Sequence, residues 1–220
     1  MSKIKSASEA ISIVKDKDRI MVGGFGLIGC PLTLVEALAK HSVKDLTIIS
    51  NNLGEPNGKG LGKILHQYKI KKAIGSFFTS NPDVIKFVEK NQLDVELVPQ
   101  GTLAEAIRAA GAGIGGFYTK TSANTILAEN KEYRWIDDVK YVFEKPIHAN
   151  VSLIKAWKAD KNGNLVYYKT ARNFNPVMAM AADICIAEVD EIVEPGELDP
   201  EEIVTPHIFV DMIVKSEVNL

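Results

Sequence analysis

The stretch VGGFGLIGCP, from Val22 to Pro31, lies between an apolar segment and an amphipathic segment. Its glycines Gly24, Gly26 and Gly29 have the spacing G-x-G-x-x-G, which joins a strand to a helix in nucleotide-binding folds. Such glycines expose backbone amides beside a helix N-terminus, where negative charge is stabilised. The stretch therefore predicts a strand–loop–helix unit that binds an anion, and it places the chain in the α/β class.

The anion is not identified by the glycines alone. A dinucleotide site also needs an acidic residue about 20 residues further on, to bind the ribose hydroxyls. Ser50, Asn51 and Asn52 occupy that region, and none of them has a carboxylate. The loop therefore favours a carboxylate, a phosphate, or the oxyanion of a thioester during acyl transfer. A dinucleotide, and a tight turn without any ligand, remain open as alternatives at this point.

Outward from the loop, apolar runs alternate with amphipathic segments. Strands buried on both faces are predicted at 20–22, 46–49, 73–78 and 95–98. Helices are predicted at 31–40, 61–66, 82–90 and 102–110, and capping boxes at Ser6–Glu9 and Thr102–Glu105 mark two helix starts. This alternation predicts an open, mainly parallel sheet with helices on both faces.

The second half of the chain has the pattern of added antiparallel β-hairpins. Segments 133–136 and 141–143 flank Asp137-Asp138, and segments 151–156 and 165–168 flank Asn162-Gly163, a strong turn signal. A helix at 176–182 and strands at 184–189 and 208–214 are predicted to follow. Because no linker or low-complexity tract interrupts the chain, we expect one domain over residues 1–220.

Composition excludes several classes of function. The chain has 26 Lys and Arg against 28 Asp and Glu, without a block of like charges, so no nucleic-acid partner is expected. Its two cysteines, Cys30 and Cys185, and its isolated histidines predict neither a disulfide nor a metal site. We expect a cytoplasmic protein without a membrane anchor, because the first residues lack a signal-peptide pattern and no apolar run is long enough to span a bilayer.

From Asp18 to Pro31 the sequence resembles the signature of the A (alpha) subunit of class I coenzyme A transferases, of the 3-oxoacid and the acetate or butyrate-acetoacetate types. The shared core is an apolar run, Gly-Gly-Phe, three residues, Gly, one residue and Pro. Similar blocks follow in order at 49–52, 99–105, 111–119, 153–160, 171–176 and 191–198. The chain departs from the family pattern at Lys120, Ser122, Asn124 and His207, so we expect these two loops to differ in shape.

The resemblance implies a CoA-transferase-like fold and a ping-pong enzyme that moves coenzyme A from an acyl-CoA to a free short-chain carboxylic or 3-oxo acid. Coenzyme A is then a substrate, and no tightly bound cofactor is expected. An enzyme carboxylate must attack the thioester in this chemistry. The resemblance places this glutamate on a separate B subunit, in a hetero-oligomer of two A and two B subunits, so no catalytic residue is expected in this chain. The glutamates that chemistry alone would allow are Glu55, Glu105, Glu188, Glu191, Glu194 and Glu197.

The same resemblance implies two groups of binding residues. Asn51, Gln100 and Gly101 are expected at the substrate carboxylate, since an amide donates two hydrogen bonds without adding a charge. Their structural alternatives are a strand-end turn for Asn51 and an ordinary loop for Gln100. The residues expected to bind the CoA thioester or its oxyanion are Gly23, Gly24, Phe25, Gly26, Leu27, Ile28, Gly29 and Cys30.

Several alternatives remain beside this interpretation. Phe25 is an equally good core residue, Cys30 is best explained as a small buried filler, and Arg172 with Asn173 and Asn175 is a weaker candidate for a carboxylate site. The rival functions are a sugar-phosphate isomerase or phosphate-sensing domain on a related sheet, a nicotinamide-dependent oxidoreductase, and a binding module without catalysis. A transferase differs from all three in requiring both coenzyme A and a second polypeptide.

Overall fold

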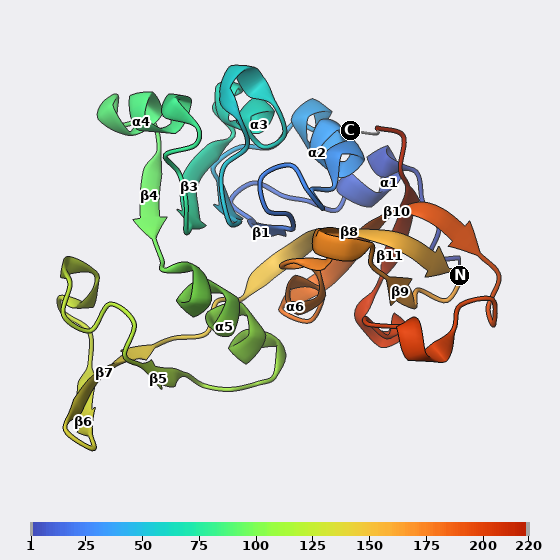
Figure 1. Cartoon of the computed structure of the whole chain (residues 1–220). Helices are drawn as coiled ribbons and strands as arrows, with labels where there is room; N and C mark the ends of the chain where they lie inside the picture. The colour runs from blue at the N-terminus through green and yellow to red at the C-terminus, as the bar shows by residue number, and fades with distance from the viewer. Residues whose placement is uncertain (1, 219–220) are drawn as a thin grey trace.

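The computed structural model describes residues 2–218 of the 220-residue chain. The order of the main sheet is β11-β10-β8-β1-β2-β3-β4, with β1 (Arg19–Val22) at its centre (Figure 1). Neighbouring strands along this path are parallel, which confirms the predicted sheet. The other strands of the path are β2 (Leu46–Ile49), β3 (Ile70–Gly75), β4 (Asp94–Leu97), β8 (Ala149–Asp160), β10 (Ala182–Val193) and β11 (Met212–Lys215).

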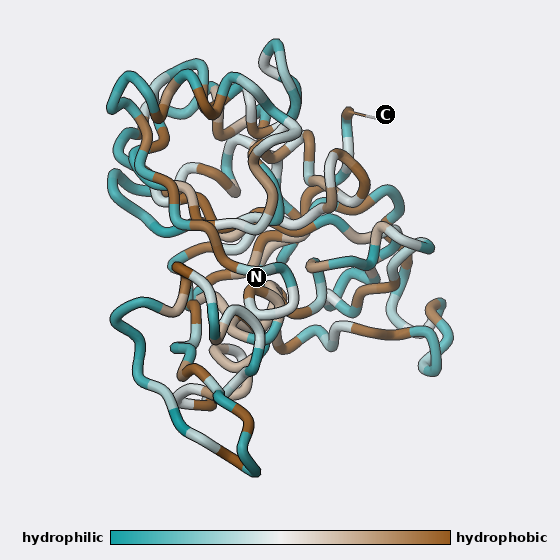
Figure 2. Tube along the Cα trace, turned by 60° about the vertical axis from the view of Figure 1, so that its left-hand side comes forward, coloured by the Kyte–Doolittle hydropathy of each residue, from teal (hydrophilic) through white to brown (hydrophobic). Residues whose placement is uncertain are grey.

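Helices cover both faces of this sheet, as predicted (Figure 1). One face carries α1 (Ala7–Ile11), α2 (Leu32–Lys40), α3 (Gly62–His66) and α4 (Pro82–Glu89), and the other carries α5 (Gln100–Gly111) and α6 (Asn175–Ala179). Figure 2 shows apolar segments running through the interior of the molecule and polar segments concentrated in the outer loops.

The apolar run of β1 follows directly from this two-sided packing. Ile20 and Val22 belong to the core on the α2 side, and Met21 belongs to the core on the α5 side. All three side chains are fully buried, and each such burial contributes about 2 kcal/mol of hydrophobic free energy. Because neither face of β1 meets water, its sequence shows no polar alternation.

A smaller antiparallel sheet, β5-β7-β6, extends from the main body as an arm (Figure 1). Its strands are β5 (Phe117–Thr119), β6 (Tyr133–Ile136) and β7 (Val139–Glu144). Asp137 and Asp138 both adopt positive φ, 48° and 59°, as a two-residue hairpin turn requires. The first predicted hairpin is therefore confirmed.

The second predicted hairpin is present across the Asn162-Gly163 turn, but it is shorter than predicted. Only two residue pairs join β8 to the short antiparallel strand β9 (Leu165–Val166), while β8 runs parallel to β1 on one side and β10 on the other. The Asn162-Gly163 turn signal is local, whereas the partners of β8 are distant in the chain. The strand predicted at 73–78 also begins earlier, at Ile70, and ends at Gly75.

Of the two predicted capping boxes, one is confirmed and one is wrong. Ser6 and Glu9 form the predicted capping box at α1. The box predicted at Thr102 is wrong, because α5 begins two residues earlier, at Gln100. Glu105 bonds to Arg108 instead of reaching back, and the buried Thr102 hydroxyl has no partner among the described residues.

Pro31 and the C-terminal elements also differ from prediction. Pro31 precedes α2 as its N-cap and does not lie within the first turn. Helix α6 ends at Ala179, and β11 begins only at Met212, because residues 207–209 form a short 3-10 turn. Apolar periodicity locates these elements but does not determine their ends.

Candidate active site

The carboxyl ends of β1 to β4 bring the predicted site residues to one edge of the sheet. The glycine loop, residues 23–30, follows β1, and Ser50 to Asn52 follow β2. Ser76 and Phe77 follow β3, and Gln100 follows β4 after a short connection. Parallel strands end at the same edge, which is where ligands bind in open α/β sheets.

The glycine loop is a tight hairpin with an apolar tip. Phe25 and Ile28 exchange backbone hydrogen bonds of 2.9 and 3.2 Å across the two-residue turn Gly26-Leu27, and Gly26 adopts a φ of +63°. The Phe25 and Ile28 side chains are 53% and 50% exposed. Phe25 is therefore not a core residue, and the loop presents two apolar side chains at the sheet edge.

Asparagine side chains hold the loop from two directions. The Gly24 N–H donates to Asn173 Oδ1 at 3.1 Å, and the Gly26 N–H donates to Asn52 Oδ1 at 2.9 Å. The expectation of bare glycine amides is wrong at these two positions, because neighbouring loops already supply acceptors. The N–H groups of Leu27 and Gly29 have no acceptor among the described residues.

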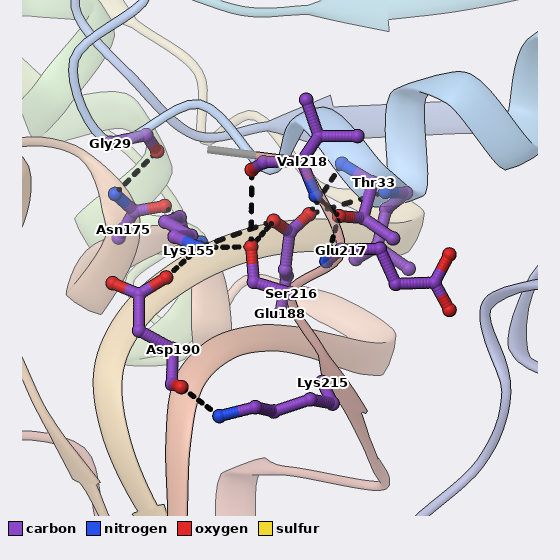
Figure 3. Close-up of polar contacts among 11 residues, drawn as sticks. Gly29, Thr33, Lys155, Asn175, Glu188, Asp190, Lys215, Ser216, Glu217 and Val218 are labelled. Atoms are coloured by element: carbon purple, nitrogen blue, oxygen red, sulfur yellow. Dashed lines mark hydrogen bonds and ion pairs between the residues drawn. The ribbon is translucent and has the colours of Figure 1, made fainter. Parts of the chain in front are cut away.

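The N-terminus of α2, directly after the loop, is also occupied (Figure 3). Glu188 on β10 accepts hydrogen bonds from the Thr33 and Leu34 N–H groups at 2.9 and 3.2 Å. The Glu188 side chain is fully buried and is paired with Lys155. The chain's own carboxylate therefore takes the position at which the glycine pattern predicts an external anion.

Asn51 and Gln100, 49 positions apart in the sequence, are in direct contact. Asn51 Oδ1 accepts from Gln100 Nε2 at 3.1 Å and from Ser76 Oγ at 2.7 Å. These two donors fix the orientation of the Asn51 amide, so that its Nδ2 group remains as a free donor among the described residues. Asn51 is only 1% exposed as a whole residue, but its Nδ2 atom is not fully buried. The site thus contains one oriented N–H₂ group.

The remaining predicted residues have simpler surroundings. Gly101 is exposed, and a Cβ there would meet no atom within 4 Å, so packing does not require glycine. Arg172 is exposed and forms no ion pair with the described residues. Lys120, Ser122 and Asn124 lie in the loop that follows β5 in the arm.

Cys30 is a buried filler at the base of the loop. Burial, reinforced by the nearby Glu188 carboxylate, raises the pKa of the Cys30 thiol to about 12. The pKa of the Cys185 thiol is also raised by burial to about 12. Neither cysteine therefore supplies a thiolate nucleophile near neutral pH.

This predicts that both cysteines resist alkylation. The folded protein at pH 8 should incorporate no iodoacetamide within minutes, because a thiol with a raised pKa is almost entirely protonated there. In denaturant, both thiols return to ordinary pKa values and should react fully, as measured by intact mass. Fast labelling of Cys30 in the folded protein would contradict the buried geometry.

The six candidate glutamates differ in their contacts. Both Glu188 oxygens already accept hydrogen bonds, and Glu105 forms a bidentate pair with Arg108, which lowers the pKa of Glu105. Glu191 and Glu194 pair with lysines, and Glu197 accepts a backbone N–H. Glu55 lies in the turn that precedes residues 56–58. Only Glu188 is buried, and it caps a helix.

Sequence reasoning named Asn173 and Asn175 only as part of a weaker carboxylate site, and it missed their role in holding the loop in place. Asn175 donates to Gly29 O at 3.0 Å and accepts from Lys155 N at 2.9 Å, while Asn173 donates to Ile28 O at 3.0 Å. The sequence signal for this role is the Asn-x-Asn pair at 173 and 175, because two asparagine amides can hydrogen-bond the backbone of a neighbouring loop. Nothing local connected them, or Glu188, to a loop about 150 residues away.

Two further observations concern the described residues 2–218. They contain no group of three His, Cys, Asp or Glu side chains arranged to hold a metal ion. None of their helices combines the length and the apolar character that a bilayer span requires.

Comparison with known proteins identifies the family. A family model described as "Coenzyme A transferase" matches residues 4–216. The A subunit of a probable succinyl-CoA:3-ketoacid coenzyme A transferase of Bacillus subtilis (strain 168) is 50% identical, covering 97% of this chain and 90% of that protein. The A subunit of a 3-oxoadipate CoA-transferase of Pseudomonas putida is 48% identical, covering 96% of this chain and 91% of that protein.

A solved structure has the same fold. An acyl-CoA transferase from Escherichia coli O157:H7, in a thioester complex with CoA, superposes with a TM-score of 0.88 at 22% identity. The match covers 100% of this chain and 48% of that one, so this chain spans about half of that protein. Given a family model that matches nearly the whole sequence and relatives that share half of its residues, this chain belongs to the coenzyme A transferase family.

Proposed function

We propose that this chain is the A subunit of an enzyme that transfers coenzyme A from an acyl-CoA to a free short-chain carboxylic or 3-oxo acid. The observation that carries the proposal is the Asn51 amide, which Ser76 and Gln100 orient so that an N–H₂ donor remains at the sheet edge that also carries the glycine loop. A neutral donor suits a carboxylate that must enter, react and leave. The relatives named as CoA-transferase A subunits support the same reaction class.

The chemistry follows a ping-pong sequence in which a glutamate of the B subunit is the nucleophile. Its carboxylate attacks the thioester carbonyl, the C–S bond breaks, and an acyl anhydride and the CoA thiolate form. The thiolate then attacks the glutamyl carbonyl and releases the first acid, which leaves a glutamyl-CoA thioester. The second acid repeats these steps in reverse order and departs as a new acyl-CoA, so the glutamate is regenerated.

In this scheme the present chain binds and orients substrates. Asn51 Nδ2, with Gln100 beside it, donates to the acid carboxylate. The glycine loop covers the CoA thioester: the free Leu27 and Gly29 N–H groups face developing negative charge, and Phe25 and Ile28 contact the apolar part of the CoA arm. Gly23, Gly24 and Cys30 are buried and form the packed base that supports the loop.

Apolar exposure at this edge supports a second polypeptide there. The side chains of Phe77 and Leu97 are about half exposed near the ends of β3 and β4. Exposed apolar side chains that gather on one edge mark an interaction surface. We assign this edge to the B subunit, in an assembly of two A and two B subunits.

The direct test is to purify this chain alone and together with a B-type CoA-transferase chain. We expect no transfer of CoA to acetate or acetoacetate by the chain alone, and turnover only in the complex. After treatment with an acyl-CoA, intact-mass analysis should place the CoA adduct on the B-type chain. Turnover by the isolated chain, or an adduct on one of its own side chains, would overturn the proposal.

A further inference from the structure

Helix α2 begins without a cap from its own sequence. Its N-cap is Pro31, which makes no side-chain hydrogen bond, and its first turn contains no acidic residue. The Leu32 N–H donates to Cys30 O at 2.9 Å, so the Thr33 and Leu34 N–H groups are left without a local acceptor. A buried helix start of this kind requires an acceptor from elsewhere in the fold.

Glu188 supplies that acceptor from 155 residues further along the chain. Its Oε2 accepts from Thr33 N at 2.9 Å and from Leu34 N at 3.2 Å. Its Oε1 accepts from Ser216 Oγ at 2.7 Å and from Lys155 Nζ at 3.2 Å. With 0% exposure, this carboxylate is fully satisfied and matches the positive end of the helix dipole.

The residues around Lys155 hold both ends of the same short segment (Figure 3). The Lys155 side chain pairs with Glu188, and the Lys155 N–H donates to Asn175 Oδ1, whose amide holds Gly29 O at 3.0 Å. The segment from Gly29 to Leu34 is therefore fixed at its start by Asn175 and at its end by Glu188. A shift of α2 along its axis would move the glycine loop with it.

We infer that Glu188 is a positioning residue for CoA transfer: it fixes the start of α2 and thereby the geometry of the glycine loop. Lys155 and Asp190, whose carboxylate lies 2.5 Å from Lys155 Nζ, complete the charge balance of this cluster. This inference rests on the proposed role of the glycine loop in turnover. It assigns to Glu188 a function separate from that of the nucleophile.

Two substitutions separate the contributions of Glu188. Glu188→Gln keeps an acceptor for the two α2 amides but removes the charge and places an NH₂ group toward Lys155 Nζ. Glu188→Ala removes the acceptor as well. In the complex with the B-type chain, we expect kcat to fall about 10-fold for the first and about 100-fold for the second, with KM changed less than about threefold.

The matched control is Glu191→Gln on the same strand. Glu191 is exposed and forms an ion pair with Lys158, at 2.8 Å, and its side chain has no hydrogen bond to α2 among the described residues. This variant should keep the kcat and KM of the parent. It removes the same charge three residues away, so it controls for a general effect of charge on β10.

Hydrogen exchange of the isolated chain provides a readout that does not depend on turnover. Exchange in residues 23–34 should rise about 10-fold or more in Glu188→Gln, while the strands β2 and β3 keep their protection. Glu191→Gln should leave both regions unchanged. Should Glu188→Ala fail to fold, the Gln variant still decides the outcome.

Parent-like exchange in residues 23–34 of Glu188→Gln would overturn the inference, as would raised exchange with an unchanged kcat. A uniform rise in exchange over the whole chain would reduce Glu188 to a general stabilising role and would also overturn it. Failure of the proposed function has a different signature. In that case the CoA adduct of the parent complex appears on this chain, whatever the exchange pattern of the variants.

Discussion

Gly29→Ala should lower the free energy of unfolding by about 3 kcal/mol or more and abolish CoA transfer. Gly29 has a φ of +70°, and a Cβ added there would lie 2.5 Å from the backbone oxygen of Ala171. It would also lie 2.8 Å from Asn173 Nδ2 and 3.0 Å from Asn175 Nδ2, the two groups that hold the loop carbonyls. The methyl group therefore displaces the contacts that give the loop its shape.

Gly26→Ala is the matched control for this variant. Gly26 has a similar φ of +63°, but a Cβ there would meet no atom within 4 Å. Its cost should be limited to the left-handed backbone conformation, about 1 kcal/mol. Urea denaturation of the isolated chain measures both values. Equal destabilisation by the two substitutions would show that backbone conformation alone, and not the packing beneath Gly29, determines the loop.

Asn51→Asp should reduce kcat/KM for the carboxylic acid by about 100-fold or more while the fold is kept. The Asn51 Oδ1 acceptor, which bonds to Ser76 and Gln100, is preserved in the variant, and only the Nδ2 donor is lost. A carboxylate then faces the carboxylate of the substrate. Like charges at this separation repel, and the lost donor adds to the penalty.

The pH dependence of this variant has a defined sign. Burial raises the pKa of an introduced carboxyl group, and its protonated form again offers one O–H donor. The defect should therefore shrink as the pH falls below neutrality and grow as the pH rises. Steady-state kinetics of the reconstituted complex between about pH 5.5 and 8 measure this trend.

Asn150→Asp provides the control on the same sheet. Asn150 lies near the start of β8, at the opposite edge, where its Oδ1 accepts from Arg19 N at 2.9 Å, an interaction that Asp retains. This variant should keep parent-like kcat/KM. If Asn51→Asp also retained the parent kcat/KM, Asn51 would not bind the substrate carboxylate.

Local patterns in the sequence predicted the elements that depend on local physics. The apolar run Ile20–Val22 predicted a doubly buried strand, and Ser6 with Glu9 predicted a helix start. The pair Asp137-Asp138 predicted a hairpin. Thr102 shows the limit of such patterns. The sequence around Thr102 matches a capping box, but the box does not form because the helix already begins at Gln100.

The resemblance to a family selected residues that the fold then brings together. Asn51 and Gln100 were chosen from separate blocks, and their side chains meet at 3.1 Å. The anion argument for the glycine loop was less successful in detail. Backbone amides in such a loop can bind an anion only if the rest of the chain leaves them unpaired. Here Asn52 and Asn173 accept from two glycine amides, and Glu188 accepts from the first amides of α2.

The sequence by itself therefore determined the class of sheet and the family, because these follow from short apolar runs and contiguous motifs. Only the tertiary structure decided which amides of the glycine loop are free and which carboxylate caps α2. Those contacts join residues about 150 positions apart. Their partners depend on how β8, β10 and α6 pack against β1, and no local pattern encodes that packing.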